Sequence, residues 1–156
     1  MSVLPLQHRQ RPMRLLLVED NRGDVMLLKR AFTQSNIPHE ITIARTGEEA
    51  LAIVNTAQPH TSADIIILDL NLPGLSGLEV LQALKNDAQH QSIPIFVLSS
   101  SRAQADVVES YQSHANCYLV KPHDLDSLCE IVERIGQFWY ALAVLPSHES
   151  KARAWR

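Results

Sequence analysis

The sequence predicts an α/β domain in which a parallel sheet is covered by helices on both sides. Short runs of branched apolar residues recur along the chain, as is typical of strands buried on both faces of a parallel sheet. Amphipathic helical patterns fall between these runs, and this alternation favours parallel strands joined by right-handed connections. The 156 residues suit one domain, which we place at 13–140, between a flexible N-terminal arm (1–12) and a C-terminal extension (141–156).

Five segments are predicted to form the strands of the sheet. The first, third and fourth are nearly continuous apolar runs, whereas the second and fifth carry weaker signals. The three strong runs consist mostly of branched residues. In chain order they are Leu15 to Val18, Ile41 to Ala44, Ile65 to Leu68, Ile93 to Leu98 and Cys117 to Val120.

Five helices are predicted in the segments that follow the strands. Each carries apolar residues spaced three or four apart, which is the period of one helix face, although the fourth helix is more polar than the others. The second opens with a capping-box pattern, a Thr followed three residues later by a Glu. In chain order they are Asp24 to Thr33, Thr46 to Val54, Gly77 to Lys85, Gln104 to Ser113 and a long final helix capped by Asp124.

Composition and charge exclude several classes of protein. The chain is 46% hydrophobic and 20% charged, as expected for a globular protein, and its net charge of -3 leaves no basic surplus for nucleic acid or anionic lipid. No apolar run approaches the roughly 20 residues that span a bilayer, and the N-terminus lacks the apolar core of a signal peptide. We therefore expect a cytoplasmic protein in which Cys117 and Cys129 are buried free thiols.

Polar residues occupy the ends of four predicted strands. Glu19 and Asp20 follow the first strand, Asp69 ends the third, Ser99 ends the fourth and Lys121 ends the fifth. Because the carboxyl ends of parallel strands lie along one edge of the sheet, where open α/β sheets bind ligands, these residues should converge there.

The charges in this set predict a metal-assisted phosphoryl site. Three carboxylates within about 5 Å repel by a few kcal/mol per pair at an effective dielectric constant of about 20. Lys121 offsets one negative charge, and a hard cation such as Mg²⁺, which prefers oxygen ligands, would offset two. Together they would neutralise the oxygens of a phosphoryl group, the Ser99 hydroxyl would donate to a further oxygen, and Asp69 would be the nucleophile that forms an aspartyl phosphate.

Each of these residues alone has a simpler structural explanation. Asp69 followed by NLPG could start a turn, and Glu19 and Asp20 could stabilise a helix N-terminus. Ser99 could be a loop hydroxyl and Lys121 a solvated lysine. The combination of all five at strand ends, in this order, favours the phosphoryl site.

Four segments of the chain carry a family resemblance: LLLVEDN, IIILDLNLPGLSGLEVL, IPIFVLSSS and YLVKPHDLDSL. They resemble the receiver domain of two-component response regulators, and the match runs roughly from Met13 to Trp139. The resemblance implies a five-stranded, doubly wound, flavodoxin-like sheet. It also implies a phosphorelay protein that receives phosphate from a sensor histidine kinase and catalyses only its own phosphorylation and dephosphorylation. A closer resemblance is carried by three further segments: NRGDVMLLKRAF, KPHDLDSLCEIV and RIGQFW. These segments resemble the stand-alone regulators of cyanobacterial phytochromes, which implies that the kinase is a phytochrome and that the protein is a homodimer.

The resemblance assigns the metal ligands position by position. Asp69 matches the phosphorylated aspartate. Glu19 and Asp20 match the acidic pair that holds Mg²⁺, with Asp20 as the direct ligand, and Asn71 matches the position whose backbone carbonyl also binds the metal. No organic cofactor is implied.

The resemblance also assigns a switch. Ser99 matches the switch hydroxyl, Tyr118 the aromatic residue that swings inward when that hydroxyl moves, and Lys121 the phosphate-binding lysine. The Lys121-Pro122 bond corresponds to a cis peptide in the family. There are two departures: Ser99 replaces the commoner threonine and so lacks its rotamer restraint, and His123 stands where an aromatic residue is frequent.

Other functional classes fit these motifs less well. A phosphatase of the haloacid dehalogenase type needs a second Asp two residues after the nucleophile, where this chain has Asn71. A flavin binder of the flavodoxin type needs a phosphate-cradling first loop, and EDNRGD is acidic. A degenerate receiver that serves only for dimerisation would have lost part of the set, and a DNA-binding regulator would need an output domain. The sequence leaves open whether the output is protein-protein contact or onward transfer to a histidine phosphotransfer protein.

The end of the final helix predicts self-association. Its apolar pattern continues through Gln137 to Leu145, with more apolar surface than one helix stripe can bury. Exposed patches of this kind mark interfaces, so we expect a two-fold homodimer with Phe138, Trp139 and Leu142 at its interface. The alternative is that this segment folds back over the core of its own chain.

Overall fold

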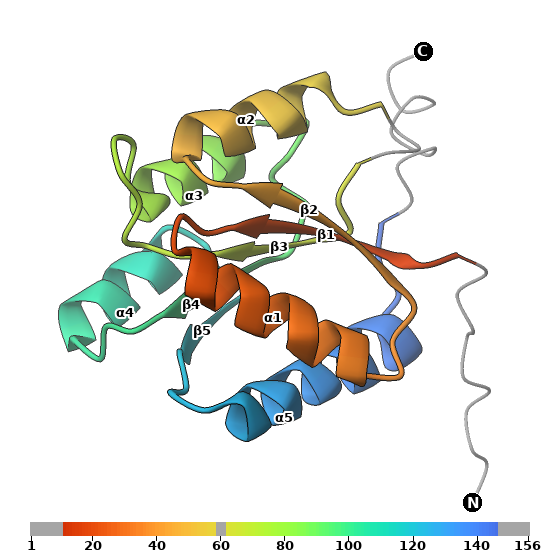
Figure 1. Ribbon diagram of the computed structural model, residues 1–156. Helices are drawn as coiled ribbons and strands as arrows, with labels where there is room; N and C mark the ends of the chain where they lie inside the picture. Colours follow the sequence, from red (N-terminus) through yellow and green to blue (C-terminus); the bar gives the residue numbers. More distant parts are fainter. Residues whose placement is uncertain (1–10, 59–61, 147–156) are drawn as a thin grey trace, which may run out of the picture.

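The computed structural model describes residues 11–58 and 62–146, which form a five-stranded sheet with helices on both faces (Figure 1). All four strand pairings are parallel and the strand order is β2-β1-β3-β4-β5, so the predicted doubly wound sheet is confirmed. The strands are β1 Met13–Val18, β2 His39–Ala44, β3 Ile65–Leu68, β4 Ile95–Ser99 and β5 Cys117–Val120. The helices are α1 Arg22–Gln34, α2 Gly47–Thr56, α3 Gly77–Lys85, α4 Gln104–Gln112, α5 Leu125–Ile135 and η1 Gly136–Leu142.

Some strand boundaries differ from the predicted ones. β1 and β2 both begin two residues earlier than expected, because Met13 pairs with His39 and extends the ladder. β4 begins at Ile95 instead of Ile93, after Pro94, which has no N–H to donate to a ladder. It also includes Ser99, so the predicted switch hydroxyl belongs to the last residue of a strand.

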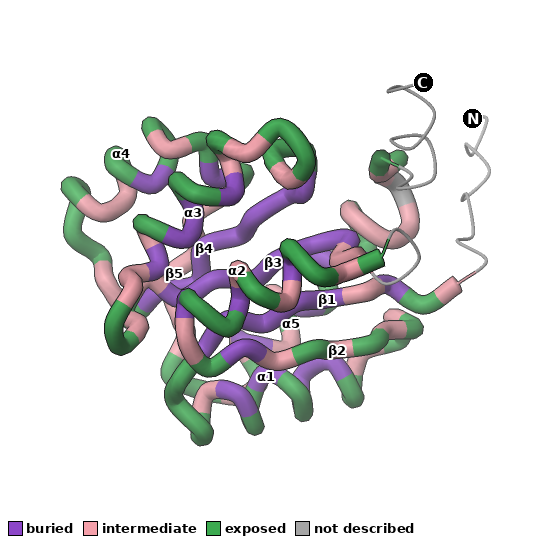
Figure 2. The backbone as a smooth tube through the Cα atoms, turned by 90° about the horizontal axis from the view of Figure 1, so that it is seen from above, coloured by how far each residue is buried: buried purple, intermediate pink, exposed green. Residues whose placement is uncertain are grey.

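The sheet separates two apolar layers. Alternate residues of β1 face opposite sides: Leu15 and Leu17 pack in the layer of α1 and α5, and Leu16 and Val18 in the layer of α2 and α3. The two helix pairs are seen on opposite sides of the sheet in Figure 1, and α4 lies beside β5. Figure 2 shows that β1, β3 and β4 form the buried centre. This packing holds the strand ends, and the polar residues that follow them, in fixed relative positions.

The final helix changes its winding, which the sequence pattern does not predict. α5 ends at Ile135 and the chain continues as the π-helix η1, after which the Ala143 amide donates to the Phe138 carbonyl at 2.7 Å, five residues back. Even with this continuation, no helix within the described ranges is long and apolar enough to cross a bilayer.

The two aromatic residues of η1 have different environments. Trp139 is half-buried, and its ring packs against Phe96 of β4 with centroids 5.0 Å apart. Phe138 is 55% exposed and touches the Trp139 ring edge-on at 5.4 Å. Trp139 therefore covers the core of its own chain, while Phe138 presents apolar surface to solvent. The side chain of Leu142, the third predicted interface residue, lies outside the described part of the structure.

Both cysteines are free, as predicted, but they are half-buried instead of buried. Burial raises the pKa of the Cys117 thiol to about 11.

Candidate functional site

The first strand delivers two carboxylates to the carboxyl edge of the sheet. β1 stops at Val18, but the Glu19 amide still donates to the Ala44 carbonyl of β2 at 2.9 Å, which keeps Glu19 in line with the strand. Its side chain is buried and Oε1 accepts a hydrogen bond from the Asn21 amide at 3.1 Å. Asp20 is exposed. One carboxylate of the pair therefore points into the protein and the other borders solvent.

The third strand delivers Asp69 to the same edge. Its amide donates to the Val18 carbonyl at 3.0 Å, and its buried side chain accepts at Oδ1 from the Asn71 amide at 3.2 Å. The following loop closes where the Gly77 amide donates to the Leu70 carbonyl at 3.0 Å. A Cβ at Gly77 would lie 2.0 Å from the Asp69 carbonyl oxygen, so only glycine lets the loop pass this close to the Asp69 backbone.

Oxygen atoms of Glu19, Asp20 and Asp69 lie within 4.8 Å of one another. Like charges at this spacing repel, and three oxygen donors are the ligands that a hard divalent cation prefers. The donor set therefore fits a divalent metal, as the sequence predicts. The part of Asn71 that the structure ties to the site is its amide, so metal binding by its carbonyl stays a prediction.

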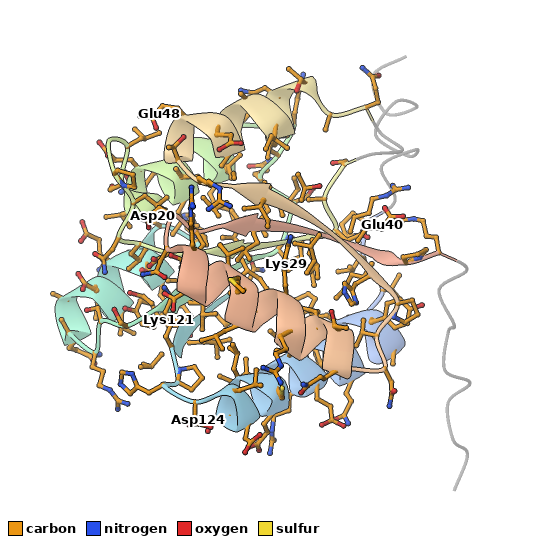
Figure 3. All side chains as sticks on the ribbon, viewed as in Figure 1. Asp20, Lys29, Glu40, Glu48, Lys121 and Asp124 are labelled. Atoms are coloured by element: carbon orange, nitrogen blue, oxygen red, sulfur yellow. The ribbon has the colours of Figure 1, made fainter. Side chains whose placement is uncertain are left out.

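Lys121 supplies the positive charge of the site. It follows β5, and its amide donates to the Ser99 carbonyl at 2.8 Å, continuing the strand pairing. Its ammonium donates to Glu19 Oε2 at 2.6 Å and to Asp69 Oδ2 at 3.1 Å. The lysine from the fifth strand and the acids from the first and third thus converge as predicted, and Figure 3 shows Lys121 and Asp20 at the same end of the sheet.

A fourth carboxylate, from Asp24, was not among the predicted site residues. Its Oδ2 lies 2.9 Å from the Lys121 ammonium. Asn21 caps α1 by accepting from the Asp24 amide, so the helix begins two residues before the predicted start and Asp24 lies in its first turn. An acidic residue in the first turn of a helix that starts directly after the acidic pair was the sequence signal for this position.

The pKa values of Glu19 and Lys121 are both raised, which favours the neutral form of the acid and the charged form of the lysine. Burial raises the pKa of Glu19 to about 7 against the hydrogen bond from Lys121, and the charge of Asp69 adds to the rise. Burial acts to lower the pKa of Lys121, but its hydrogen bonds to Glu19 and Asp24 and the charge of Asp69 prevail and raise it. Lys121 therefore stays charged, and a cation in the acidic cluster would favour the ionised form of Glu19.

The predicted switch residues are connected through the loop between β4 and α4. Ser99 is fully buried, and its hydroxyl oxygen accepts from the Ser101 amide at 3.2 Å. The Tyr118 hydroxyl donates to the Ser101 carbonyl at 2.9 Å, and the Tyr118 amide donates to the Tyr111 hydroxyl at 3.1 Å. The Ser101 hydroxyl donates to Asp106 in the first turn of α4. Ser99 and Tyr118 thus share a hydrogen-bonded partner that reaches α4.

The peptide bond between Lys121 and Pro122 differs from the cis bond that the resemblance implies. No peptide in the described ranges is cis, so Lys121-Pro122 is trans. His123 is exposed, and Asp124 caps α5 as predicted, accepting from the Ser127 amide at 2.7 Å.

Comparison with known proteins identifies the family of this site. The sequence pattern of the response regulator receiver domain matches residues 15–133. Response regulator Rcp1 of Synechocystis sp. is 37% identical over 139 residues, which cover 87% of this chain and 95% of Rcp1. The probable methanogenesis regulatory protein FilR2 of Methanothrix harundinacea is 35% identical over 130 residues, which cover 82% of this chain and 84% of FilR2.

Two solved structures share both the fold and much of the sequence. The phosphorylated cyanobacterial phytochrome response regulator RcpA is 40% identical with a TM-score of 0.80, over 87% of this chain and 99% of RcpA. The Mn²⁺-bound form of Rcp1 is 38% identical with a TM-score of 0.77, over 86% of this chain and 99% of that structure.

Proposed function

The chain belongs to the response regulator receiver domain family, and we propose that its Asp69 accepts a phosphoryl group from a phosphohistidine of a sensor histidine kinase. Members of this family are signalling proteins and not classical enzymes, and the similarity to Rcp1 and RcpA is consistent with phosphorelay signalling. The observation that carries the proposal is the convergence of Glu19, Asp20, Asp69 and Lys121 at one edge of the sheet.

The proposed reaction is a phosphoryl transfer between two side chains. A carboxylate oxygen of Asp69 attacks phosphorus, the phosphorus-nitrogen bond of the phosphohistidine breaks, and the imidazole nitrogen keeps the bonding pair and is protonated from solvent. The ammonium of Lys121, 3.1 Å from Asp69 Oδ2, neutralises an oxygen of the transferred group. Water later attacks the aspartyl phosphate and releases inorganic phosphate.

We propose Mg²⁺ as the cation of the acidic cluster. Asp20, Asp69 and the Asn71 carbonyl would hold it, and Glu19 would assist through water. When bound, it neutralises negative charge on the phosphoryl oxygens. The 4.8 Å cluster and the Mn²⁺-bound form of the similar protein Rcp1 support this assignment.

We propose a phytochrome as the cognate kinase and a homodimer as the signalling form. The first proposal is supported by the 40% identity to RcpA, a cyanobacterial phytochrome response regulator. The second is supported by the exposed side chain of Phe138, which lies against Trp139. Trp139 packs on the core and so holds the Phe138 ring in place, and exposed aromatic residues of this kind are frequent anchors of interfaces. Phosphorylation would change these protein-protein contacts through the Ser99-Ser101-Tyr118 connection.

Intact-protein mass spectrometry tests the central claim. Wild-type protein incubated with acetyl phosphate and Mg²⁺ should gain one phosphoryl group, and Asp69→Asn should gain none. Asp126→Asn is the matched control, because Asp126 is an exposed acid in the first turn of α5. Labelling of Asp69→Asn equal to wild type would show that the acceptor lies elsewhere.

Phosphotransfer profiling then tests the partner. A phosphorylated phytochrome kinase should label this protein faster than kinases of other sensor classes do, and loss of label to a histidine phosphotransfer protein would reveal onward transfer. Equal rates from all kinases would contradict the phytochrome proposal while leaving the acceptor assignment intact.

A further inference from the structure

Asp24 is a charged residue of the site that has no role in the phosphorylation reaction proposed above. Its carboxylate comes from the first turn of α1, whereas the acids of the metal cluster stand at strand ends. Its amide is fixed by the Asn21 side chain at 3.0 Å, and its own side chain is 37% exposed. Asp24 therefore reaches the site from the solvent side, on a helix whose start is rigidly capped.

The contacts of Lys121 show what Asp24 does in the unphosphorylated protein. A lysine ammonium has three N–H donors and no acceptor. Three carboxylates take them: Glu19 at 2.6 Å, Asp24 at 2.9 Å and Asp69 at 3.1 Å. The ammonium is therefore saturated, and a phosphoryl oxygen on Asp69 can bind it only by displacing one of these partners or sharing its donor.

Asp24 is the partner whose position makes it a competitor with the phosphoryl group. Glu19 is buried beside Asp69 and belongs to the acidic cluster, and Asp69 is itself the acceptor. Asp24 belongs to neither and is the most exposed of the three, so exchanging its contact for a phosphoryl oxygen leaves the carboxylate solvated and costs little desolvation.

We propose that Asp24 is a positioning residue that binds the Lys121 ammonium in the unphosphorylated protein and competes with the phosphoryl group for it. Asp24 would thereby set the relative stability of the metal-loaded, unphosphorylated site and the phosphorylated site. This inference rests on the proposed function of Asp69. The negative charge of Asp24 draws Lys121 away from an incoming anion and adds to the field that attracts a cation. Removing that charge weakens one of the three contacts of the lysine, which should favour the anion without favouring the metal.

The test measures the two ligands separately in Asp24→Asn, which keeps the side-chain shape and removes the charge. Beryllofluoride, which mimics a phosphoryl group on a carboxylate, is titrated calorimetrically at saturating Mg²⁺, and Mg²⁺ is titrated alone. We expect beryllofluoride to bind roughly three- to tenfold more tightly than in wild type, and Mg²⁺ to bind no more tightly than in wild type. Asp24→Ala should likewise tighten beryllofluoride binding without tightening Mg²⁺ binding, and the charge-retaining Asp24→Glu should return the beryllofluoride affinity toward that of wild type.

Asp126→Asn is the matched control, since it removes an exposed first-turn carboxylate of α5 from the same end of the sheet. It should leave both affinities within twofold of wild type. A merely structural role for Asp24 would weaken both ligands together. Unchanged or weaker beryllofluoride binding in Asp24→Asn, or tightening of both ligands, overturns the inference. Failure of wild type to bind beryllofluoride would instead overturn the proposed function of Asp69.

Discussion

Truncating the two neighbouring aromatic residues of η1 should have very different effects on stability. Trp139→Ala removes a half-buried ring that packs on Phe96 at 5.0 Å, whereas Phe138→Ala removes a ring that is 55% exposed. Both residues share one helix, so the comparison controls for helix propensity and for position in the chain. The difference between the two variants therefore reports how each ring is packed.

The magnitudes follow from burial. Deleting a fully buried large aromatic residue costs about 3–5 kcal/mol, of which an aromatic pair supplies about 0.5–1.5 kcal/mol. Trp139 is only half-buried, so we expect Trp139→Ala to lower the free energy of unfolding by about 2–3 kcal/mol. Phe138 loses mainly its edge contact with Trp139, and we expect Phe138→Ala to cost about 0.5–1 kcal/mol in the monomer.

Urea unfolding followed by far-ultraviolet circular dichroism measures both variants. Runs at two protein concentrations separate the intrinsic cost from any contribution of dimerisation, because only the latter depends on concentration. Sedimentation equilibrium on the same samples should show that Phe138→Ala weakens the proposed dimer. Equal unfolding costs for the two variants would refute the packing argument, and a Phe138→Ala dimer as tight as wild type would move the interface elsewhere.

Four further outcomes are expected. Gly77→Ala should lower the melting temperature and weaken Mg²⁺ binding, because the new Cβ would lie 2.0 Å from the Asp69 carbonyl oxygen; a wild-type melting curve contradicts this. Asp20→Ala should abolish metal-dependent phosphorylation while stabilising the metal-free protein against urea, and unchanged Mg²⁺ affinity would remove Asp20 from the ligand set. Ser99→Ala should accept phosphate yet show smaller chemical-shift changes around Tyr118, and shifts as large as in wild type would exclude the Ser99 switch. Cys117 should react slowly with iodoacetamide at neutral pH and faster as the pH rises toward its pKa of about 11, and a rate independent of pH would contradict the burial argument.

The fold was predictable because its buried strands appear in the sequence as short, nearly continuous runs of apolar residues. β3 and β5 match the predicted ranges, since an apolar strand end followed by a polar residue marks where the chain leaves the sheet. The convergence of Asp69 and Lys121 followed from parallel topology alone, which places residues 52 positions apart at one edge. The start of β1 at Met13 was missed because it depends on pairing with β2, a long-range contact that no local pattern records.

Two features of the structure, one in the site and one in the final helix, depend on geometry that local patterns do not fix. The contact of Asp24 with Lys121 depends on the angle at which α1 leaves β1, and hence on packing with α5. The segment after Ile135 is wound as a π-helix, but it is too short for the spacing of its apolar residues to distinguish a π-helix from an α-helix. At its first residue, Gly136, a Cβ would lie 1.9 Å from Ile37 Cδ1, so this close approach depends on a residue about 100 positions earlier in the chain.

The hydrogen bond from the Tyr118 amide to the Tyr111 hydroxyl has a consequence for how the protein meets other chains. β5 is one of the two outer strands of the sheet, and an outer strand with free backbone donors is a template for intermolecular strand addition and aggregation. The hydroxyl at 3.1 Å occupies the donor at Tyr118, so a foreign strand cannot extend the sheet here without breaking that bond. A strand that approaches this edge must therefore displace the Tyr111 hydroxyl before it can pair with the Tyr118 amide.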